Sequence, residues 1–486
     1  MLLKTGLFGL TLSLLSIIFN TIVSIKRFSL LSTGVVLVIS ILIFRIFDVN
    51  SAIFQFIFES YCFDKHFLSL FYSFGLDGLS IYFYLLTSFL VFLCVIFIWN
   101  EKNFKEYVIL LMFLELLLIL TFSVLNIFLF YIFFECILIP IYSIIVIWGS
   151  REKKIRASYL LFFYTVCCSL PFLISIFYIY TLSGTFNFEY FFVGYKFSLE
   201  EQCFLWFAFF LSFSSKIPMF PFHIWLPEAH VEAPTVGSVL LAGILLKLGV
   251  YGFLRYCLLM FPDACTFFSP IVNVLCIFGL LSASLSAIKQ TDLKKIIAYS
   301  SIAHMNLVVL GVFSGNILGI SGAILQSVSH GFVSSALFFL IGILYSRYHS
   351  RYLLYYGGII HIMPLYSVFF LFFTMSNIAL PGTSSFIGEF LLLLSVFNES
   401  VISSLFAGLS VVLSGAYSLW LYNRIVFGNL KTEYLKMYLD ISLKEFVILF
   451  FLFLPSLYLG LLPFKFLDTL HLSLSQIFIV INGLYL

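Results

Sequence analysis

Apolar stretches long enough to cross a membrane follow one another along almost the whole chain of 486 residues. The first stretch, 6–25, is followed by no small-residue cleavage site of the kind that ends a secretory signal. A span needs about 20 apolar residues, so the sequence predicts about fourteen transmembrane helices. After the first, the predicted spans begin near Leu30, Leu79, Tyr107, Asn126, Ala157, Phe204, Ala233, Phe267, Ile296, Ile317, Met363, Val401 and Phe446.

Composition supports an all-α membrane protein. The chain is 62% hydrophobic and 10% charged, whereas soluble domains are about 45–50% apolar and about 25% charged. So little charge cannot cover a water-soluble surface, which excludes a soluble enzyme, a secreted disulfide scaffold and a disordered chain. The net charge of +3 is too small to suggest nucleic-acid binding.

Basic residues alternate between successive loops. The odd-numbered loops carry Lys26, Arg27, Lys102, Lys105, Arg151, Lys153, Lys154, Arg156, Lys289, Lys294, Lys295, Arg347, Arg351, Arg424, Lys431 and Lys436. The even-numbered loops carry little basic charge: Lys65, Lys196 and, at a helix end, Arg255. By the positive-inside rule the odd loops face the cytoplasm or the mitochondrial matrix, and both termini lie on the opposite side.

Proline interrupts two of the predicted spans, the seventh at 214–221 and the twelfth at 379–385. Broken backbone inside a membrane persists only where it is buried in protein or lines water. The breaks lie five spans apart, which predicts two inverted five-helix repeats of the kind that mark ion or substrate paths. The predicted division is 1–105 for helices 1–3, 106–262 and 263–430 for the two repeats, and 431–486 for the last helix and a tail.

Ionisable residues at mid-span are the main functional signal. Each costs roughly 2.5–3.5 kcal/mol on insertion scales. The six strongest candidates are Glu135, Lys216, Lys247, His304, His330 and Glu389. Six such groups favour a proton path over six separate structural polar groups. Burial disfavours a charge and pairing favours it, so a buried Glu–Lys pair can hold or release a proton as it closes or opens.

Weaker candidates are Glu115, His223, Glu228, His230 and Asp292. Glu115 could face a gap remote from lipid or pair with a neighbouring chain. The groups in the connector 222–234 could form an entry for protons or a hydrogen-bonded loop, since His suits both roles. Asp292, with Lys294 and Lys295, is expected to be a solvated cluster that helps to set the topology.

Motifs for cofactors are missing from the sequence. Apart from the adjacent pair Cys167 and Cys168, the nine cysteines stand singly, with no metal-ligand spacing. No GxGxxG, Walker loop or HExxH is present. We therefore expect no redox centre, metal site or nucleotide site in this chain.

Several stretches resemble the antiporter-like membrane subunits of respiratory complex I, the NADH:ubiquinone oxidoreductase. They are FFE at 133–135, LIP at 138–140, HIWLPEAHVEAP at 223–234, LKLG at 246–249, DLKKIIAYSS at 292–301, LPGTSSFIGEF at 380–390 and YSLWLYNR at 417–424. The resemblance is highly specific from about Asp77 to Asp468, whereas the first two helices are generic.

The resemblance implies a role for each of the six main candidates. It makes Glu135 and Lys216 an ion pair, Lys247 a central lysine, His304 and His330 hydrated central histidines, and Glu389 an exit-side acid. In the sibling chains 2 and 5 the twelfth helix carries Lys at the position of Glu389, and chain 5 has an additional lateral helix. Both points set this sequence apart from those siblings.

The resemblance also implies a proton-translocating subunit of the membrane arm, coupled to electron transfer from NADH to ubiquinone in other subunits. Those subunits would bind NADH, FMN, iron–sulfur clusters and ubiquinone, and chains 2 and 5 would be neighbours. The 64 Phe and 12 Pro of this chain fit an AT-rich gene, and its local similarity to plant and protist versions suggests mitochondrial encoding, with a bacterial chain as the alternative. We therefore expect the mitochondrial inner membrane, with the termini in the intermembrane space. The alternatives are a subunit of a related cation/proton antiporter complex and a non-conducting membrane scaffold.

Overall fold

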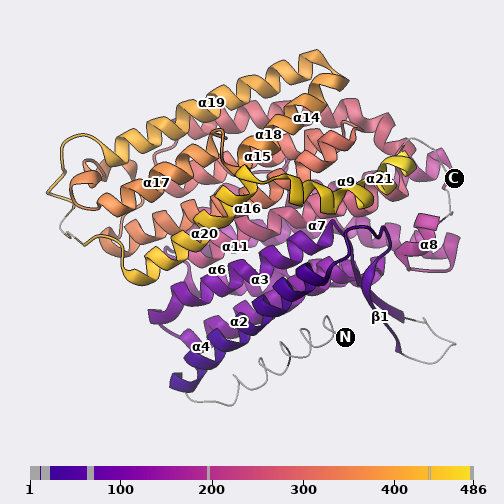
Figure 1. Cartoon of the computed structure of the whole chain (residues 1–486), viewed down its shortest axis with the longest axis horizontal. Coiled ribbons are helices and arrows are strands. Elements are labelled where there is room, and N and C mark those ends of the chain that lie inside the picture. The colour runs from indigo at the N-terminus through magenta and orange to yellow at the C-terminus, as the bar shows by residue number, and fades with distance from the viewer. Residues whose placement is uncertain are drawn as a thin grey trace.

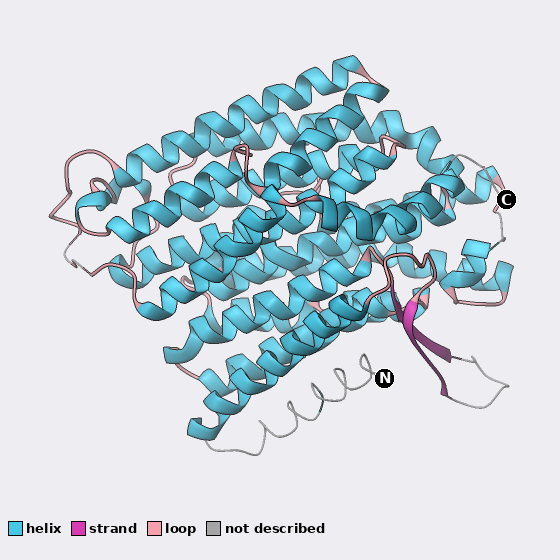
Figure 2. Ribbon diagram, viewed as in Figure 1, coloured by secondary structure: helices cyan, strands magenta, loops and turns pink. Residues whose placement is uncertain are grey.

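The computed structural model describes residue 11 and residues 22–62, 70–193, 197–435, 437 and 439–481. Helices that run side by side make up most of it, and their loops gather at two ends (Figure 1 and Figure 2). Most of the predicted first span, 6–25, lies outside the described residues, as do Lys65, Lys196 and Lys436 of the loop-charge prediction.

The helices and strands follow one another in a simple order. They are α2 (Ile22–Ile46), β1 (Gln55–Cys62), β2 (Leu70–Leu76), α3 (Ser80–Phe97), α4 (Phe104–Ser123), α5 (Ile127–Cys136), α6 (Leu138–Trp148), α7 (Lys154–Ser183), α8 (Phe188–Val193), α9 (Leu199–Lys216), α10 (Trp225–Glu232), α11 (Thr235–Leu240), α12 (Leu246–Gly252), α13 (Leu258–Met260), α14 (Pro262–Lys289), α15 (Leu293–Val312), α16 (Ile317–Tyr348), α17 (Pro364–Asn377), α18 (Ser384–Glu399), α19 (Val401–Val426), α20 (Leu443–Leu461) and α21 (Phe464–Ile481). Two π-helical segments, Leu241–Leu245 and Phe253–Cys257, join α11, α12 and α13 into one continuous span.

Within the described residues, eleven helices are long and apolar enough to cross a membrane. Two further predicted spans are the broken helices α9–α10 and α17–α18. Together with the stretch 6–25, these correspond to the spans predicted from the sequence. The all-helical membrane fold class is therefore confirmed.

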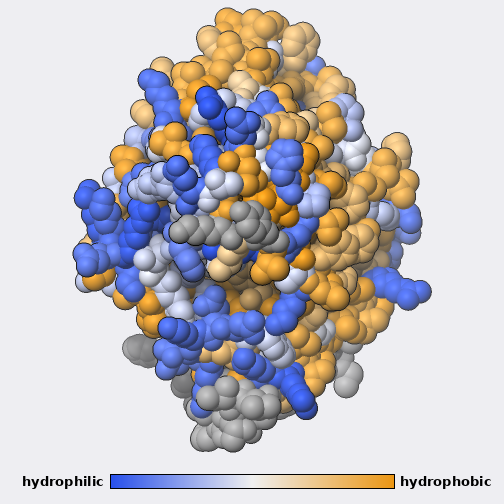
Figure 3. Space-filling model, turned by 90° about the vertical axis from the view of Figure 1, so that its left-hand side faces the viewer, coloured by the Kyte–Doolittle hydropathy of each residue, from blue (hydrophilic) through white to orange (hydrophobic). Residues whose placement is uncertain are grey.

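The predicted odd loops lie together at the left-hand end in Figure 1. The Ser150 N–H donates to the Glu232 carbonyl at 3.2 Å, and the Leu293 N–H donates to the Arg351 carbonyl at 3.0 Å. We call this end, which carries the loops near Lys102, Arg151, Lys289, Arg347 and Arg424, the basic end. Figure 3 looks onto it and shows hydrophilic side chains gathered there, with apolar side chains over the upper and right-hand flanks.

Extra structure fills the two long even loops at the opposite end. Strands β1 and β2 form an antiparallel pair in the loop between α2 and α3. The loop between α7 and α9 holds the short helix α8. Each of these two loops therefore holds elements of its own.

The helix breaks occur where the prolines predict them, and side chains satisfy the carbonyls that the breaks leave free. Beyond the end of α9, the Trp225 Nε1–H donates to the Ser215 carbonyl at 2.9 Å. Beyond the end of α17, the Ser385 hydroxyl donates to the Ser376 carbonyl. Such partners are required because the last four carbonyls of a helix have no partner within the helix. The freed carbonyls of Ser215 and Ser376 thus have protein partners, whereas Pro221 and Pro381 within the two breaks are exposed on this chain.

Two elements form the centre of the bundle. The most apolar windows of the span 235–260 and of α16 are both 100% buried, whereas that of α20 is 22% buried. Glycines allow the span 235–260, which we call the central span, to approach its neighbours closely. A Cβ at Gly243 would lie 2.5 Å from Leu90 Cδ1, and one at Gly249 would lie 2.4 Å from Ile217 Cγ1. Polar groups on these two central elements therefore face protein rather than lipid.

The C-terminal region holds a second helix instead of the simple tail that was predicted. Helix α20 begins with a capping box, in which Ser442 N–H donates to Glu445 Oε2 at 2.7 Å. Helix α21 follows and packs against α13, α14 and α16. Pro463 divides the two helices, because proline is favoured at the first positions of a new helix.

Candidate functional site

The six main candidates lie on six different helices. They are Glu135 on α5, Lys216 on α9, Lys247 on α12, His304 on α15, His330 on α16 and Glu389 on α18. Five of them are at most 5% exposed, and Glu135 is half-buried. The structure brings four of the six into one line of close neighbours and leaves Glu135 and Lys216 apart from that line.

We call Lys247, His330, His304 and Glu389 the central relay. Its first link joins α12 to α16, where Lys247 Nζ lies 2.9 Å from His330 Nδ1. The same ammonium donates to the carbonyl of Ala242, which lies in the π-helical segment just before Lys247. Segments of this kind often occur at functional sites. Lys247 is 0% exposed, so protein groups rather than bulk water surround its ammonium.

The second half of the central relay joins α15 to α18. His304 Nδ1 lies 2.9 Å from Glu389 Oε1, and Gln326 Nε2 donates to the same oxygen at 3.1 Å. The rings of His304 and His330 have centroids 5.7 Å apart. The spatial order is therefore lysine, histidine, histidine and carboxylate across the centre of the bundle.

Close helix packing sets the position of Glu389. A Cβ at Gly388 would lie 2.6 Å from Gln326 Oε1, so only glycine lets α18 lie this close to α16. The preceding break starts α18 inside the bundle and carries Glu389 towards its middle. The position of this acid thus follows from a proline break and a glycine contact that both occur in the sequence.

A small cavity adjoins the end of the central relay. It has a volume of about 10 Å³ and is lined by His304, Glu389, Ser410 and Ser414 among others. One water molecule needs a cavity of about 10–15 Å³ with several polar partners. The site can therefore take one water molecule beside the carboxylate of Glu389.

Glu135 and Lys216 do not form a closed ion pair. They are absent from the ion pairs within 4.0 Å among the described residues, although their charges still interact over a longer distance. Lys216 Nζ has no hydrogen-bond partner and lies 4.5 Å from the ring centroid of Phe134. A buried ammonium over an aromatic face gains a cation–π attraction. The predicted pair is therefore open.

The weaker candidates are scattered. Glu115 is 0% exposed and neither carboxylate oxygen has a hydrogen-bond partner. Glu228 forms a partly exposed ion pair with Lys295 at 3.1 Å, and His223 is half-buried in the connector between α9 and α10. Asp292 precedes α15 without a side-chain capping bond. None of these contacts joins them to the central relay.

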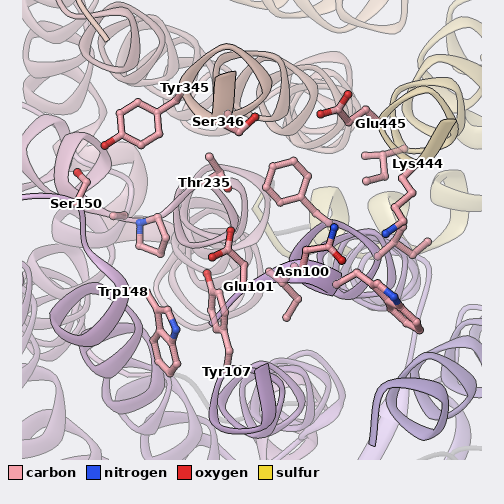
Figure 4. A pocket seen from close by; sticks show the side chains of 18 of the residues that line it. Asn100, Glu101, Tyr107, Trp148, Ser150, Thr235, Tyr345, Ser346, Lys444 and Glu445 are labelled. Carbon is pink, nitrogen blue, oxygen red and sulfur yellow. The ribbon is translucent and has the colours of Figure 1, made fainter. Parts of the chain in front are cut away.

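A cavity of about 500 Å³ opens at the basic end between α3, α4, α11, α16 and α20. Figure 4 shows Glu101 in its middle between Thr235 and Tyr107, with Lys444 and Glu445 on the side of α20. Its volume lies within the range of about 300–1,000 Å³ that is typical of pockets for small molecules. The cavity is therefore large enough to hold many water molecules.

The inner wall of this cavity includes Lys294, which is 3% exposed. Its ammonium donates to the Ala233 carbonyl at 2.6 Å and to Ser238 Oγ at 3.4 Å. The prediction of a solvated cluster is therefore wrong for Lys294. Successive helical residues point about 100° apart because a turn holds 3.6 residues, so Lys295 faces the surface while Lys294 faces the bundle.

Ser238 links Lys294 to His230. The Ser238 hydroxyl donates to the His230 carbonyl at 3.1 Å. The His230 ring is 0% exposed, stacks on Phe338 with centroids 4.7 Å apart, and has no hydrogen bond to either nitrogen. Lys294 and Lys247 both interact with it electrostatically. His230 is thus close enough to interact with a residue of the basic-end cavity wall and with one of the central relay.

Known proteins resemble this chain in sequence. A family model described as NADH:quinone oxidoreductase/Mrp antiporter, TM, matches residues 124–414. NADH-ubiquinone oxidoreductase chain 4 of Chondrus crispus is 49% identical over 92% of this chain and 91% of its own length. The chain 4 protein of Arabidopsis thaliana is 47% identical over 93% and 91%.

Solved structures show the same fold. A chain in the structure of respiratory complex I from Thermus thermophilus with bound NADH is 26% identical, with a TM-score of 0.88 and full coverage of both chains. A chain of the Mrp complex from Dietzia sp. is 20% identical, with a TM-score of 0.85 over 99% of this chain and 98% of the other. The chain therefore belongs to the NADH:quinone oxidoreductase/Mrp antiporter transmembrane family, within the group of NADH-ubiquinone oxidoreductase chain 4 proteins.

Proposed function

We propose that this chain is a proton-translocating subunit of the membrane arm of respiratory complex I. The observation that carries the proposal is the central relay, a buried line of proton-exchanging groups that crosses the interface between α12, α15, α16 and α18. Ionisable groups at membrane depth are costly and mark proton paths. NADH oxidation and ubiquinone reduction, with their cofactors, take place in other subunits.

Proton transfer along the central relay needs only short movements. Lys247 can pass a proton to His330 across 2.9 Å, and His304 can exchange one with Glu389 across 2.9 Å. No hydrogen bond joins His304 to His330, whose ring centroids are 5.7 Å apart, so a water molecule or a ring rotation completes the link. Moving one proton against 100 mV requires about 2.3 kcal/mol, which a change of partner at a buried charge can supply.

The open pair Glu135–Lys216 supplies such a change. When the pair is open, the Lys216 ammonium lies over the ring of Phe134 and interacts with the Glu135 carboxylate only at a distance beyond 4.0 Å. When it closes, the carboxylate stabilises the ammonium directly, because an opposite charge nearby favours the charged form. We infer that opening and closing of this pair changes the electrostatic potential at Lys247 and so drives protons along the central relay.

The basic-end cavity is the entry in this proposal. Protons pass from the cavity past Lys294 to His230 and then to Lys247. We expect His230→Phe to lower proton pumping severalfold, because phenylalanine keeps the stack on Phe338 but cannot carry a proton. The measurement is NADH-driven acidification in vesicles that hold the assembled complex.

The matched control is His361→Phe, since His361 is exposed at the same end and should tolerate the change. Wild-type pumping by the His230→Phe complex would exclude this entry route, while the central relay could still be tested separately.

The proposed organisation keeps the division into 1–105, 106–262, 263–430 and 431–486. It is supported by the two helix breaks, because α9–α10 lies in the first proposed repeat and α17–α18 in the second. Inverted repeats place their broken helices around a common path. The sibling chains 2 and 5 are the proposed neighbours in the membrane arm.

The proposed location is the mitochondrial inner membrane, with the basic end in the matrix and both termini in the intermembrane space. We expect single cysteines at Lys431 and Asn398 to be labelled from opposite sides of sealed vesicles. Both positions are exposed, the first beyond α19 at the basic end and the second in the last turn of α18. Labelling of both positions from one side would overturn this topology.

Co-purification tests the assembly itself. Solubilised in mild detergent and captured through this chain, the complex should bring flavin-containing and iron–sulfur subunits and should oxidise NADH. Recovery of only cation/proton antiporter subunits, without those redox subunits, would favour the related antiporter complex instead.

A further inference from the structure

A second large cavity lies at the basic end, away from the central relay. Its volume is about 550 Å³, within the range of about 300–1,000 Å³ typical of ligand pockets. The last turn of α19, the loop that follows it and the segment 353–357 form its walls. The proposed proton path makes no use of it.

Hydrogen bonds between the loops hold these walls in place. The Gly358 N–H donates to the Phe427 carbonyl at 3.1 Å, and the Leu353 N–H donates to the Thr291 carbonyl at 2.9 Å. A Cβ at Gly358 would lie 2.8 Å from the Gly428 carbonyl oxygen, so the two loops touch backbone to backbone. The cavity is therefore built by tertiary structure and does not depend on one surface loop.

The charge of the cavity is wholly positive. Its lining includes Arg424 and Lys431 and no acidic side chain, whereas the lining of the basic-end cavity of Figure 4 includes Glu101 and Glu445. Among the described residues, no hydrogen bond or ion pair engages the exposed guanidinium of Arg424. A guanidinium in this state is suited to a phosphate oxygen, which it can bind through two N–H groups.

An apolar stripe leads from the cavity along the outside of α19. It is formed by Leu405, Leu409, Val412, Ala416 and Trp420, which are spaced by three or four residues and therefore lie on one face of the helix. The exposed fractions of Leu405 and Val412 are 69% and 73%. Trp420 itself lines the cavity, and tryptophan is enriched where a membrane meets water.

A cationic cavity at a basic membrane surface, continuous with an apolar helix face, matches the two parts of an anionic lipid. We propose that this cavity binds the phosphate headgroup of an anionic phospholipid, with the acyl chains along the stripe on α19. Basic pockets between transmembrane helices on this side of a membrane bind such headgroups. The site is separate from the proton path and does not depend on it.

The test uses the intact complex and photoactivatable lipids in nanodiscs. An anionic diazirine-labelled phosphatidylglycerol should cross-link to residues 405–431, and a zwitterionic diazirine-labelled phosphatidylcholine should do so weakly. Arg424→Gln should lower the anionic cross-link about fivefold, the effect expected for one basic residue at a membrane surface. The matched control is Arg156→Gln, which also removes an exposed arginine at the basic end. Arg156 lines a different pocket, and the acidic Glu152 lines that pocket with it.

Competition distinguishes the sources of phosphate. Unlabelled phosphatidylglycerol should abolish the cross-link, and inorganic phosphate at equal concentration should not. Equal labelling by both lipids, displacement by inorganic phosphate, or an unchanged signal in Arg424→Gln would overturn the proposal. No lipid cross-link at all in the assembled complex would also overturn it and would indicate that a neighbouring subunit covers the cavity.

Discussion

Lys247→Ala is expected to remove most NADH-driven proton pumping while the complex still assembles. Lys247 is the one group of the central relay on the central span, and its ammonium contacts both His330 and the Ala242 carbonyl. A positioned proton-transferring group contributes about 10²–10⁴-fold to a rate, so we expect pumping to fall by about tenfold or more. Proton uptake and release by proteoliposomes, normalised to assembled complex on a native gel, measure the effect.

Lys247→Arg should retain more activity than Lys247→Ala, because arginine keeps the positive charge although it resists deprotonation. Lys289→Ala is the control, since Lys289 is an exposed lysine at the end of α14. Equal turnover for Lys247→Ala and wild type would remove Lys247 from the proton path.

Glu135→Gln is expected to have the second largest effect. Glutamine keeps the shape of the side chain but cannot titrate, so closure onto Lys216 would no longer bring a negative charge. We expect coupled pumping to fall by about tenfold or more, again on the scale of a single proton-transferring group. Lys216→Ala should give a similar loss, because it removes the other half of the same switch.

The control for this change is Glu106→Gln, an exposed acid in the first turn of α4. The ratio of protons pumped to NADH oxidised is the useful readout, because a purely structural defect would lower assembly and leave this ratio unchanged. A normal ratio in the assembled Glu135→Gln complex would show that the pair does not drive the relay.

Much of the fold could be predicted because hydrophobic length and proline are local signals. The span positions, the breaks near Pro218 and Pro381, and the grouping of the basic loops all depend on residues close together in the chain. The contacts of the central relay could not be predicted in this way. Lys247 and His330 are 83 residues apart, and only the packing of α12 on α16 brings them together.

Burial also differs between adjacent residues of the same type, and the sequence alone does not show this difference. Lys294 is buried beside Ser238, whereas Lys295 reaches the surface and pairs with Glu228. Gln326 carries no charge, so nothing marked it as the partner of Glu389 before α16 and α18 were placed side by side. The glycines of the central span illustrate the same limit. They are compatible with either water or close packing, and the short distances at Gly243 and Gly249 show close packing.

The most direct test of the central claim is proton pumping by an assembled Glu389→Ala complex. Glu389 is the last group of the central relay, and its carboxylate contacts both His304 and Gln326. Purified complexes in proteoliposomes would be compared with wild type and with a control, Glu433→Ala, in the exposed loop after α19. The account predicts that Glu389→Ala assembles but loses most of its pumping, that Glu389→Asp keeps part of it and that Glu433→Ala keeps all of it. Full pumping by the assembled Glu389→Ala complex would contradict the account, because protons would then cross the membrane without this carboxylate.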